Sequence, residues 1–216
     1  MIRAALDHLV IGADTLEQGV AWCEATLGVT PGPGGRHVLF GTHNRLLTIA
    51  DERFPRAYLE IIALDPEAPP PARPRWFGLD DPALRAELRE APRLLHAVVR
   101  TGAIDDHRLA LIGAGHQPGA VLRASRGALS WQILVRPDGA LEAGGALPTL
   151  IQWEGAHPTD AMPPSGLVLQ RLALRGLGPR VRDLLDIPGV EWRDAPGPAL
   201  CATLSTPRGD LTLESR

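Results

Sequence analysis

The stretch LDHLVIGADTLEQGVAWCEATLGV, residues 6–29, contains one strand and one helix in immediate succession. The part up to Gly12 is apolar on both faces and includes β-branched side chains, which is typical of a buried strand. Asp14 or Thr15 can cap a helix, and Glu17 stands three residues after Asp14, as a capping box requires. Apolar residues then recur at helical spacing until a glycine ends the pattern. The stretch predicts a β-α unit.

The same pattern recurs twice farther along the chain. Turn residues separate three further strands, expected at 37–40, 45–50 and 57–64, so that the first unit reads β-α-β-β-β. A second unit of the same order begins near residue 94, and a shorter third one near residue 167. We therefore expect an α+β fold of three β-α-β-β-β units, two of which form a cupped mixed sheet with helices on its outer faces.

The expected boundaries follow from this repeat. The sequence predicts a first unit at 1–66, a proline-rich linker with a short helix at 67–92, a second unit at 93–160 and a third unit at 161–216.

Composition excludes several classes of function. With 44% hydrophobic residues, 22% charged residues and a net charge of -3, the chain can bury a substantial core. Every basic residue is arginine, and no basic face for a nucleic acid is apparent. The longest apolar runs are too short to span a bilayer, and the N-terminus lacks the pattern of a secretory signal. We expect a cytoplasmic protein that contacts neither nucleic acid nor membrane.

Aligning the three units places chemically active residues at equivalent positions. The first strands carry His8, His96 and Arg171, and the last strands carry Glu60, Gln152 and Glu214. Alternate residues of a strand share a face, so Leu6, His8 and Val10 are expected to point the same way. Glu60 stands in an otherwise apolar strand, and a buried carboxylate must be paired, metal-bound or neutralised.

Residues 6–29, together with Gly41-Thr-His-Asn44 and the segments 58–63 and 147–153, resemble the vicinal oxygen chelate superfamily of glyoxalase I, ring-cleaving dioxygenases and bleomycin-resistance proteins, and in particular its glyoxalase-like domain proteins. The resemblance covers nearly the whole chain. It implies paired β-α-β-β-β units around a divalent metal, which side chains from the first and last strands of two units would hold. It also implies that His43 and Asn44 face the cup.

Two ligand sets remain open, depending on which units pair. If the first unit pairs with the second, the expected metal ligands are His8, Glu60, His96 and Gln152, although glutamine brings no charge. If it pairs with the third, Arg171 and Glu214 enter the cup and would bind an organic acid, because a guanidinium cannot ligate a metal.

Two functions also remain open. The first is an enzyme in which a metal acts as Lewis acid while Glu60 and His43 serve catalysis, and His43, Asn44, Arg171 and Glu214 contact a small organic substrate. The second is a metal-free protein that binds a small molecule without turning it over. The chain could be a monomer or a homodimer, and the homodimer is favoured. His37 and His157 are interpreted as structural, and Trp76, Trp131 and Trp153 could form the wall of an apolar pocket but are more typical of core positions.

Overall fold

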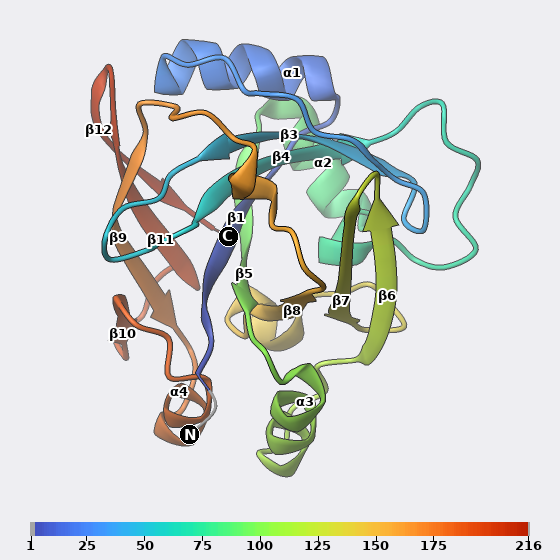
Figure 1. Ribbon diagram of the computed structural model, residues 1–216, viewed down its shortest axis with the longest axis vertical. Coiled ribbons are helices and arrows are strands. Elements are labelled where there is room, and N and C mark those ends of the chain that lie inside the picture. The colour runs from blue at the N-terminus through green and yellow to red at the C-terminus, as the bar shows by residue number, and fades with distance from the viewer. Residues whose placement is uncertain (1–2, 216) are drawn as a thin grey trace.

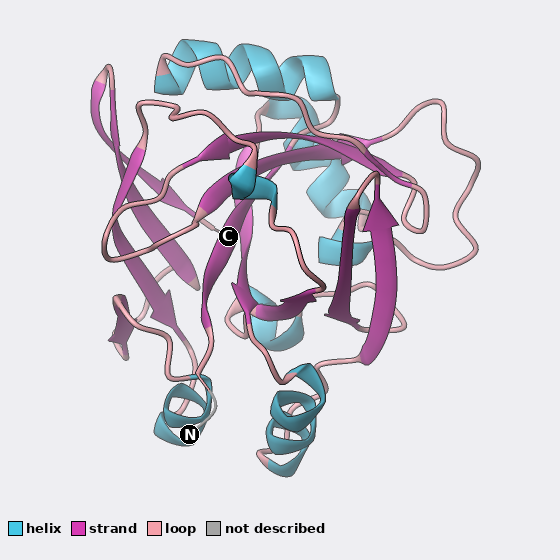
Figure 2. Cartoon of the chain, viewed as in Figure 1, coloured by secondary structure: helices cyan, strands magenta, loops and turns pink. Residues whose placement is uncertain are grey.

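The computed structural model describes residues 3–215, which form an α+β fold with two β-sheets and four α-helices (Figures 1 and 2). The expected fold class is confirmed. The strands are β1 (Ala5–Gly12), β2 (Arg36–His37), β3 (Thr42–Thr48), β4 (Tyr58–Leu64), β5 (Arg93–Arg100), β6 (Ala120–Arg126), β7 (Leu129–Val135), β8 (Thr149–Trp153), β9 (Val168–Arg175), β10 (Val190–Arg193), β11 (Leu200–Thr206) and β12 (Gly209–Glu214). The α-helices are α1 (Leu16–Trp22), α2 (Pro82–Glu90), α3 (Ile104–Gly113) and α4 (Pro179–Leu185).

The larger sheet has eight strands in the order β2-β3-β4-β1-β5-β8-β7-β6, which reads as two matching halves joined at the centre. The first strands of the two halves, β1 and β5, pair antiparallel. In each half the last strand returns beside the first and runs parallel to it, β4 beside β1 and β8 beside β5. The structure thus pairs the strands of residues 5–64 with those of residues 93–153 in one cupped mixed sheet.

A β-bulge in β1 sets which of its side chains enter the cup. Asp7 has no partner in the register with β5, where Leu6 lies opposite Val99 and His8 lies opposite Val98. A bulge inserts one residue and reverses the alternation of faces on one side of it. Leu6 therefore joins the core outside the cup, in contrast to the expectation that it shares a face with His8.

The two ends of this sheet approach each other, so the sheet is nearly closed. Arg126, the last residue of β6, donates a hydrogen bond from Nη1 to Asn44 Oδ1 of β3 at 2.8 Å. The edge strand β2 has two residues and includes only His37 of the strand expected at 37–40, because the chain turns immediately after His37 and leaves Val38 79% exposed.

Helix α1 covers the outer face of the first half and sits close to β4. A Cβ atom on Gly19 would lie 2.4 Å from Ile61 Cγ2, so the absence of a side chain allows this approach. The helix is capped by the Thr15 side chain and continues beyond Trp22 as a π-helical turn, Cys23–Leu27, which ends at Gly28 in the left-handed conformation. A π-turn re-aims the last residues of a helix without ending it.

The third unit has the expected element order but a different sheet. Its strands pair in the order β10-β9-β11-β12, with β10 parallel to β9 and β11 antiparallel on the other side. The last strand, β12, therefore lies at an edge and never meets β9. The third unit is therefore a copy in element order but not in strand order, contrary to the expectation. Strand order depends on which strand edges pair, and not on the order of elements along the chain.

This four-stranded sheet packs against the outer face of the first half and shares its largest core. Leucines of β9 and β11 join residues of β1, β3 and β4 in one apolar cluster, which includes Leu169, Leu172, Leu204, Leu9, Ile11, Leu47 and Leu59. A second cluster, with Val10, Phe40, Ile62, Trp76, Trp131 and Ile133, lies within the cup. None of the helices among residues 3–215 is long and apolar enough to cross a membrane.

The shared core predicts a single cooperative unfolding transition. Leu172→Ala should lower the free energy of unfolding by about 2–5 kcal/mol, because it opens a cavity between the two sheets. Val168→Ala, on the same strand but 37% exposed, is the control and should change stability by about 0.5 kcal/mol or less. Urea denaturation followed by circular dichroism measures both. Two separate transitions, with only one shifted in Leu172→Ala, would contradict a shared core.

Candidate functional site

Glu60 is a buried carboxylate in the wall of the cup. Strand alternation turns Tyr58, Glu60 and Ile62 of β4 inward, and Glu60 is only 4% exposed. His8 of the neighbouring strand β1 lies opposite Tyr58 in the β1–β4 register, and its ring stacks on Tyr58 with the ring centroids 4.6 Å apart. His8 Nε2 lies 3.5 Å from Glu60 Oε2. The pairing of the first and last strands of the unit thus brings together two residues that are 52 positions apart in sequence.

Asn44 donates a hydrogen bond to Oε1, the second oxygen of the Glu60 carboxylate. Its Nδ2 donates to Glu60 Oε1 at 2.5 Å, while its Oδ1 accepts from Gly35 N at 2.9 Å and from Arg126 Nη1 at 2.8 Å. The amide is therefore oriented by two donors on one side and directs its own donor at Glu60. The loop that carries Gly35 approaches closely, since a Cβ atom on Gly34 would lie 2.1 Å from the backbone oxygen of Asn44.

His37 lies beside the same carboxylate and is held neutral. Its Nε2 is 3.9 Å from Glu60 Oε1, 3.3 Å from Asn44 Nδ2 and 3.4 Å from Arg126 Nη1. Burial, followed by the charge of Arg126, lowers the pKa of His37 to about 3. The lone pair of Nε2 thus faces two donors.

Asp7 orients His8 from behind. Its Oδ1 is 2.7 Å from His8 Nδ1, and its Oδ2 accepts from Trp153 Nε1 at 2.9 Å and from His157 Nε2 at 3.0 Å. Burial alone would raise the pKa of Asp7, but hydrogen bonds from His157 and His8 hold it well below its usual range. An ionised Asp7 fixes the proton of neutral His8 on Nδ1 and leaves Nε2 free toward Glu60.

The space enclosed by these residues is small. The open volume beside His8, Glu60 and Arg126 is about 20 Å³, enough for about one water molecule. Aromatic rings form most of the remaining wall, namely Tyr58, Trp76, Phe77, Trp131 and Trp153. The indole Nε1 atoms of Trp76 and Trp131 are buried and have no hydrogen-bond partner. Two unpaired donors in the wall of a cavity can bind an oxygen atom of a ligand.

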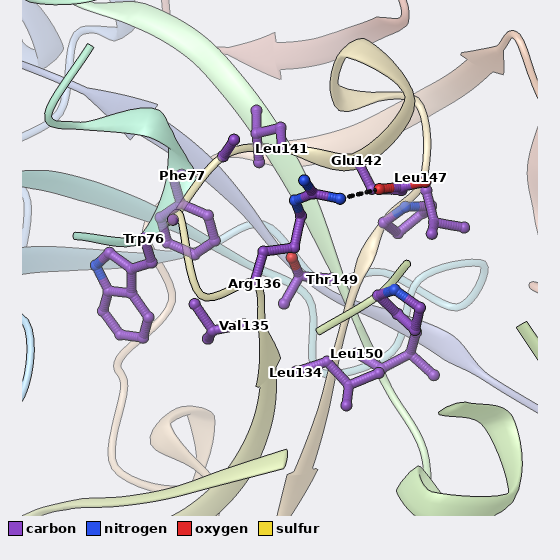
Figure 3. Close-up of a pocket in the computed structure, with 14 residues that line it drawn as sticks. Trp76, Phe77, Leu134, Val135, Arg136, Leu141, Glu142, Leu147, Thr149 and Leu150 are labelled. Carbon is purple, nitrogen blue, oxygen red and sulfur yellow. Dashed lines mark hydrogen bonds and ion pairs between the residues drawn. The ribbon is translucent and has the colours of Figure 1, made fainter. Parts of the chain in front are cut away.

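Trp76 and Phe77 form a partition between the cup and a second, small pocket, drawn in Figure 3. That pocket has an open volume of about 30 Å³, and the Arg136–Glu142 ion pair lies in its wall. The Trp76 ring stacks on Phe77 and on Phe40, with centroids 5.0 and 3.9 Å apart. Phe77 adopts a φ of 57°, which is strained for an aromatic residue and is maintained by this packing.

The second half of the sheet does not complete the expected ligand set. His96 occupies the position equivalent to His8, but its Nε2 accepts from Thr149 N at 3.0 Å. Burial lowers the pKa of His96 to about 3. Gln152 points out of the cup, and its Oε1 caps helix α3 by accepting from Ile104 N at 2.9 Å. The inward residues of β8 are Ile151 and Trp153.

Three further candidates also lie elsewhere. His43 points away from the cup, because its neighbour Asn44 points in and strand residues alternate. Arg171 is exposed on the four-stranded sheet, where its guanidinium pairs with Glu191 at 3.0 Å. Glu214 ends β12 of the same sheet. The ligand set expected from a pairing of the first and third units is therefore not assembled.

Sequence reasoning missed several residues of the cup. The sequence favours structural roles for His37 and His157 and gives no indication of Asp7 or Arg126. For Trp76, Trp131 and Trp153 it favours core positions over the wall of a pocket, yet all three line the cavity. The Asp7-His8 dipeptide and the Gly-rich loop that receives Arg126 were the available signals, but neither indicates its partner in sequence.

The residues present do not fit the expected divalent metal. Among residues 3–215, no group of three or more His, Cys, Asp or Glu side chains is spaced to hold a metal ion. His8 and Glu60 could supply two donors, but His37 Nε2 faces the Arg126 guanidinium, and a fixed cation there opposes a second one. His96 Nε2 and Gln152 Oε1 already accept hydrogen bonds from Thr149 N and Ile104 N.

Comparisons with known proteins agree with the resemblance read from the sequence. A family model described as a glyoxalase-like domain matches residues 6–182. A hypothetical protein from Staphylococcus aureus has a similar structure, with a TM-score of 0.59 and 15% identity over 99% of this chain and 86% of its own. No curated protein matches the sequence significantly.

Two methylmalonyl-CoA epimerases are similar at a lower level. The enzyme from Mycobacterium tuberculosis has a TM-score of 0.44 and 19% identity, over 73% of this chain and 91% of its own. The enzyme from Streptomyces coelicolor has a TM-score of 0.45 and 18% identity, over 72% and 100%. At these identities the similarity concerns the fold alone.

Removal of the Asp7 charge should destabilise the protein. Asp7→Asn leaves His8, His157 and Trp153 around a neutral amide and should lower the free energy of unfolding by about 3 kcal/mol. Asp183→Asn, at an exposed position of α4, is the control, with an expected change of about 0.5 kcal/mol or less. Urea denaturation at neutral pH measures both. Equal stabilities of the two variants would contradict the role given to Asp7.

The two buried histidines predict loss of stability in acid. His37 and His96 titrate near pH 3 when folded but near 6.5 when unfolded, so the unfolded chain binds more protons between these values. Stability should therefore fall as the pH falls from about 6.5 toward 3. His96→Gln should reduce the dependence by about one proton in urea titrations across this range. An unchanged slope would contradict a neutral His96.

Proposed function

Because the chain belongs to the family of glyoxalase-like domain proteins, we propose that its cup binds the oxygen-bearing end of a small organic molecule and transfers a proton on that molecule, with Glu60 as the base. The observation that carries this proposal is the buried Glu60 carboxylate, which faces His8 Nε2 at 3.5 Å in the wall of a nearly closed cavity.

The residues around Glu60 would have separate roles in such a reaction. Asn44 occupies Oε1 of Glu60, so Oε2 is the oxygen left to take a proton from a carbon beside a carbonyl group. His8 can then share that proton through Nε2, because Asp7 holds the ring and would stabilise the resulting imidazolium. Return of the proton to the same carbon or to a neighbouring one would give an isomerisation.

The electron pair released by the carbon moves to the carbonyl oxygen, which becomes an enolate. The indole N–H groups of Trp76 and Trp131 and the guanidinium of Arg126 line the same cavity and could bind that oxygen. Such donors are oriented before the reaction begins, so little reorganisation is needed. No step of this proposal goes through a metal, because His96 Nε2 and Gln152 Oε1 are bonded to backbone N–H groups and His37 Nε2 faces the Arg126 guanidinium.

One observation favours a second function, binding without turnover. Glu60 is already hydrogen-bonded to Asn44, and the open volume of about 20 Å³ admits only a few atoms of a ligand. A cup of this kind could hold the end of a molecule in place and leave it unchanged.

The two functions differ in proton exchange. Small 2-oxo acids and 2-hydroxy acids are incubated with the protein in D2O, and exchange is followed by NMR. We expect the hydrogen on C3 of a 2-oxo acid, or on C2 of a 2-hydroxy acid, to be replaced by deuterium. Glu60→Gln should slow this exchange by about 10²- to 10⁴-fold while binding persists. Glu52→Gln, a matched substitution at an exposed position, should have no effect.

Full exchange in Glu60→Gln would reject Glu60 as the base. Compounds that raise the melting temperature of the protein but never exchange would establish binding without turnover.

A further inference from the structure

A groove outside the cup shares one lining residue, Arg126, with it. The groove has an open volume of about 610 Å³ and runs between the Gly-rich loop, strand β3, the β6–β7 turn and the connection from β8 to β9. Residues of these four segments line it, including Val29, Pro33, Leu46, Leu47, Leu129, Met162 and Pro164. Because the cup itself admits only a few atoms, the remainder of any larger ligand must lie outside it.

Arg126 is the residue common to the groove and the cup. Its guanidinium donates to Asn44 Oδ1 at 2.8 Å, so the charge is held where the two spaces meet. Gly35 makes this position accessible, since a Cβ atom there would lie 2.4 Å from Arg126 Cδ. The remaining N–H groups of a guanidinium held in this way can bind a carboxylate.

Arg126 is also the only charged residue among the described residues that line the groove. The other side chains are aliphatic, proline, methionine, or the small hydroxyl groups of Thr30, Thr48 and Ser165. An apolar channel with one cation at its inner end is complementary to a molecule with one anionic end and an apolar body. Methionine in such a wall adapts to ligands of different shape.

The far wall of the groove is anchored at both ends to the first half of the cup. The segment 158–165 joins β8 to β9, and Ser165 Oγ donates to Thr48 O at 2.5 Å, which ties this wall to β3. At its start, His157 caps the short 3-10 helix Pro158–Asp160. Because His157 Nε2 also bonds Asp7 of β1 at 3.0 Å, the connection is held at its start and at its end against the first half of the cup.

We propose that the ligand is an organic acid with a single anionic end and an apolar body, which lies with its acid group against Arg126 and its body in the groove. This inference rests on the proposed function, because it assumes that the oxygen-bearing end enters the cup beside Glu60.

Binding of straight-chain carboxylates from acetate to decanoate, measured by calorimetry, tests the groove. Affinity should rise by up to about fourfold per methylene group until the chain is longer than the groove. The reason is that burial of each methylene group contributes about 0.8 kcal/mol to the free energy of binding. Met162→Glu should weaken decanoate binding by at least about tenfold and leave acetate nearly unchanged. Leu109→Glu, at an exposed position of α3 outside the groove, is the matched control and should leave the series unaltered.

Arg126 is tested by the same series. Arg126→Gln should weaken every member by a similar factor of about tenfold or more, and Arg126→Lys should restore part of the loss. Equal affinities for acetate and decanoate, or identical behaviour of Met162→Glu and Leu109→Glu, would overturn the inference. So would a dimer, detected by sedimentation, that Met162→Glu dissociates, because the groove would then be an interface.

The proposed function fails separately from this inference. If Glu60→Gln retains proton exchange but the length dependence persists, Glu60 is not the base and the groove remains the ligand site. If exchange is lost in Glu60→Gln but affinity is independent of chain length, the groove assignment fails and the base remains.

Discussion

The negative charge of a carboxylate buried in an apolar sheet must be compensated by neighbouring groups. Glu60 is such a carboxylate, and the arrangement of the whole cup depends on it. Burial of an unpaired charge costs several kcal/mol. Asn44 compensates one oxygen with a hydrogen bond, and His8 Nε2 lies 3.5 Å from the other. Each of these is held in turn, Asn44 by Gly35 and Arg126, and His8 by Asp7. The same set of contacts therefore closes the sheet and provides hydrogen-bond partners for the polar groups inside it.

The two halves of the large sheet match in strand order but not in chemistry. The first half supplies His8, His37, Asn44 and Glu60, all of them polar and directed inward. The second half supplies Trp131, Ile133 and Trp153 as wall, and only Arg126 as a charge. His96, the counterpart of His8, is bonded to Thr149 within its own half. An asymmetric cup has one polar side and one apolar side, which suits a ligand that is itself polar at one end.

The four-stranded sheet contributes to this arrangement without entering the cup. Its β9 and β11 share a core with the outer face of the first half, so the connection that precedes β9 is held at both ends. A loop fixed in this way can serve as a wall, whereas a free loop would lose that role to conformational entropy. Its Arg171 and Glu214 lie on this sheet, away from the cup.

Local patterns in the sequence determined the elements and much of the class of fold. Apolar runs predicted β1, β4, β5 and β9, helix caps predicted α1 and α2, and the repeat of units predicted that two of them share a sheet. Strand alternation predicted that Glu60 faces inward, because the period of two is a property of the backbone. Only tertiary structure decided the bulge at Asp7, the turn of His96 toward Thr149, the meeting of Arg126 with Asn44 and the strand order of the third unit. These features depend on contacts between residues up to about 150 positions apart. A local sequence pattern does not show which distant residue will become a partner, because only folding brings the two together.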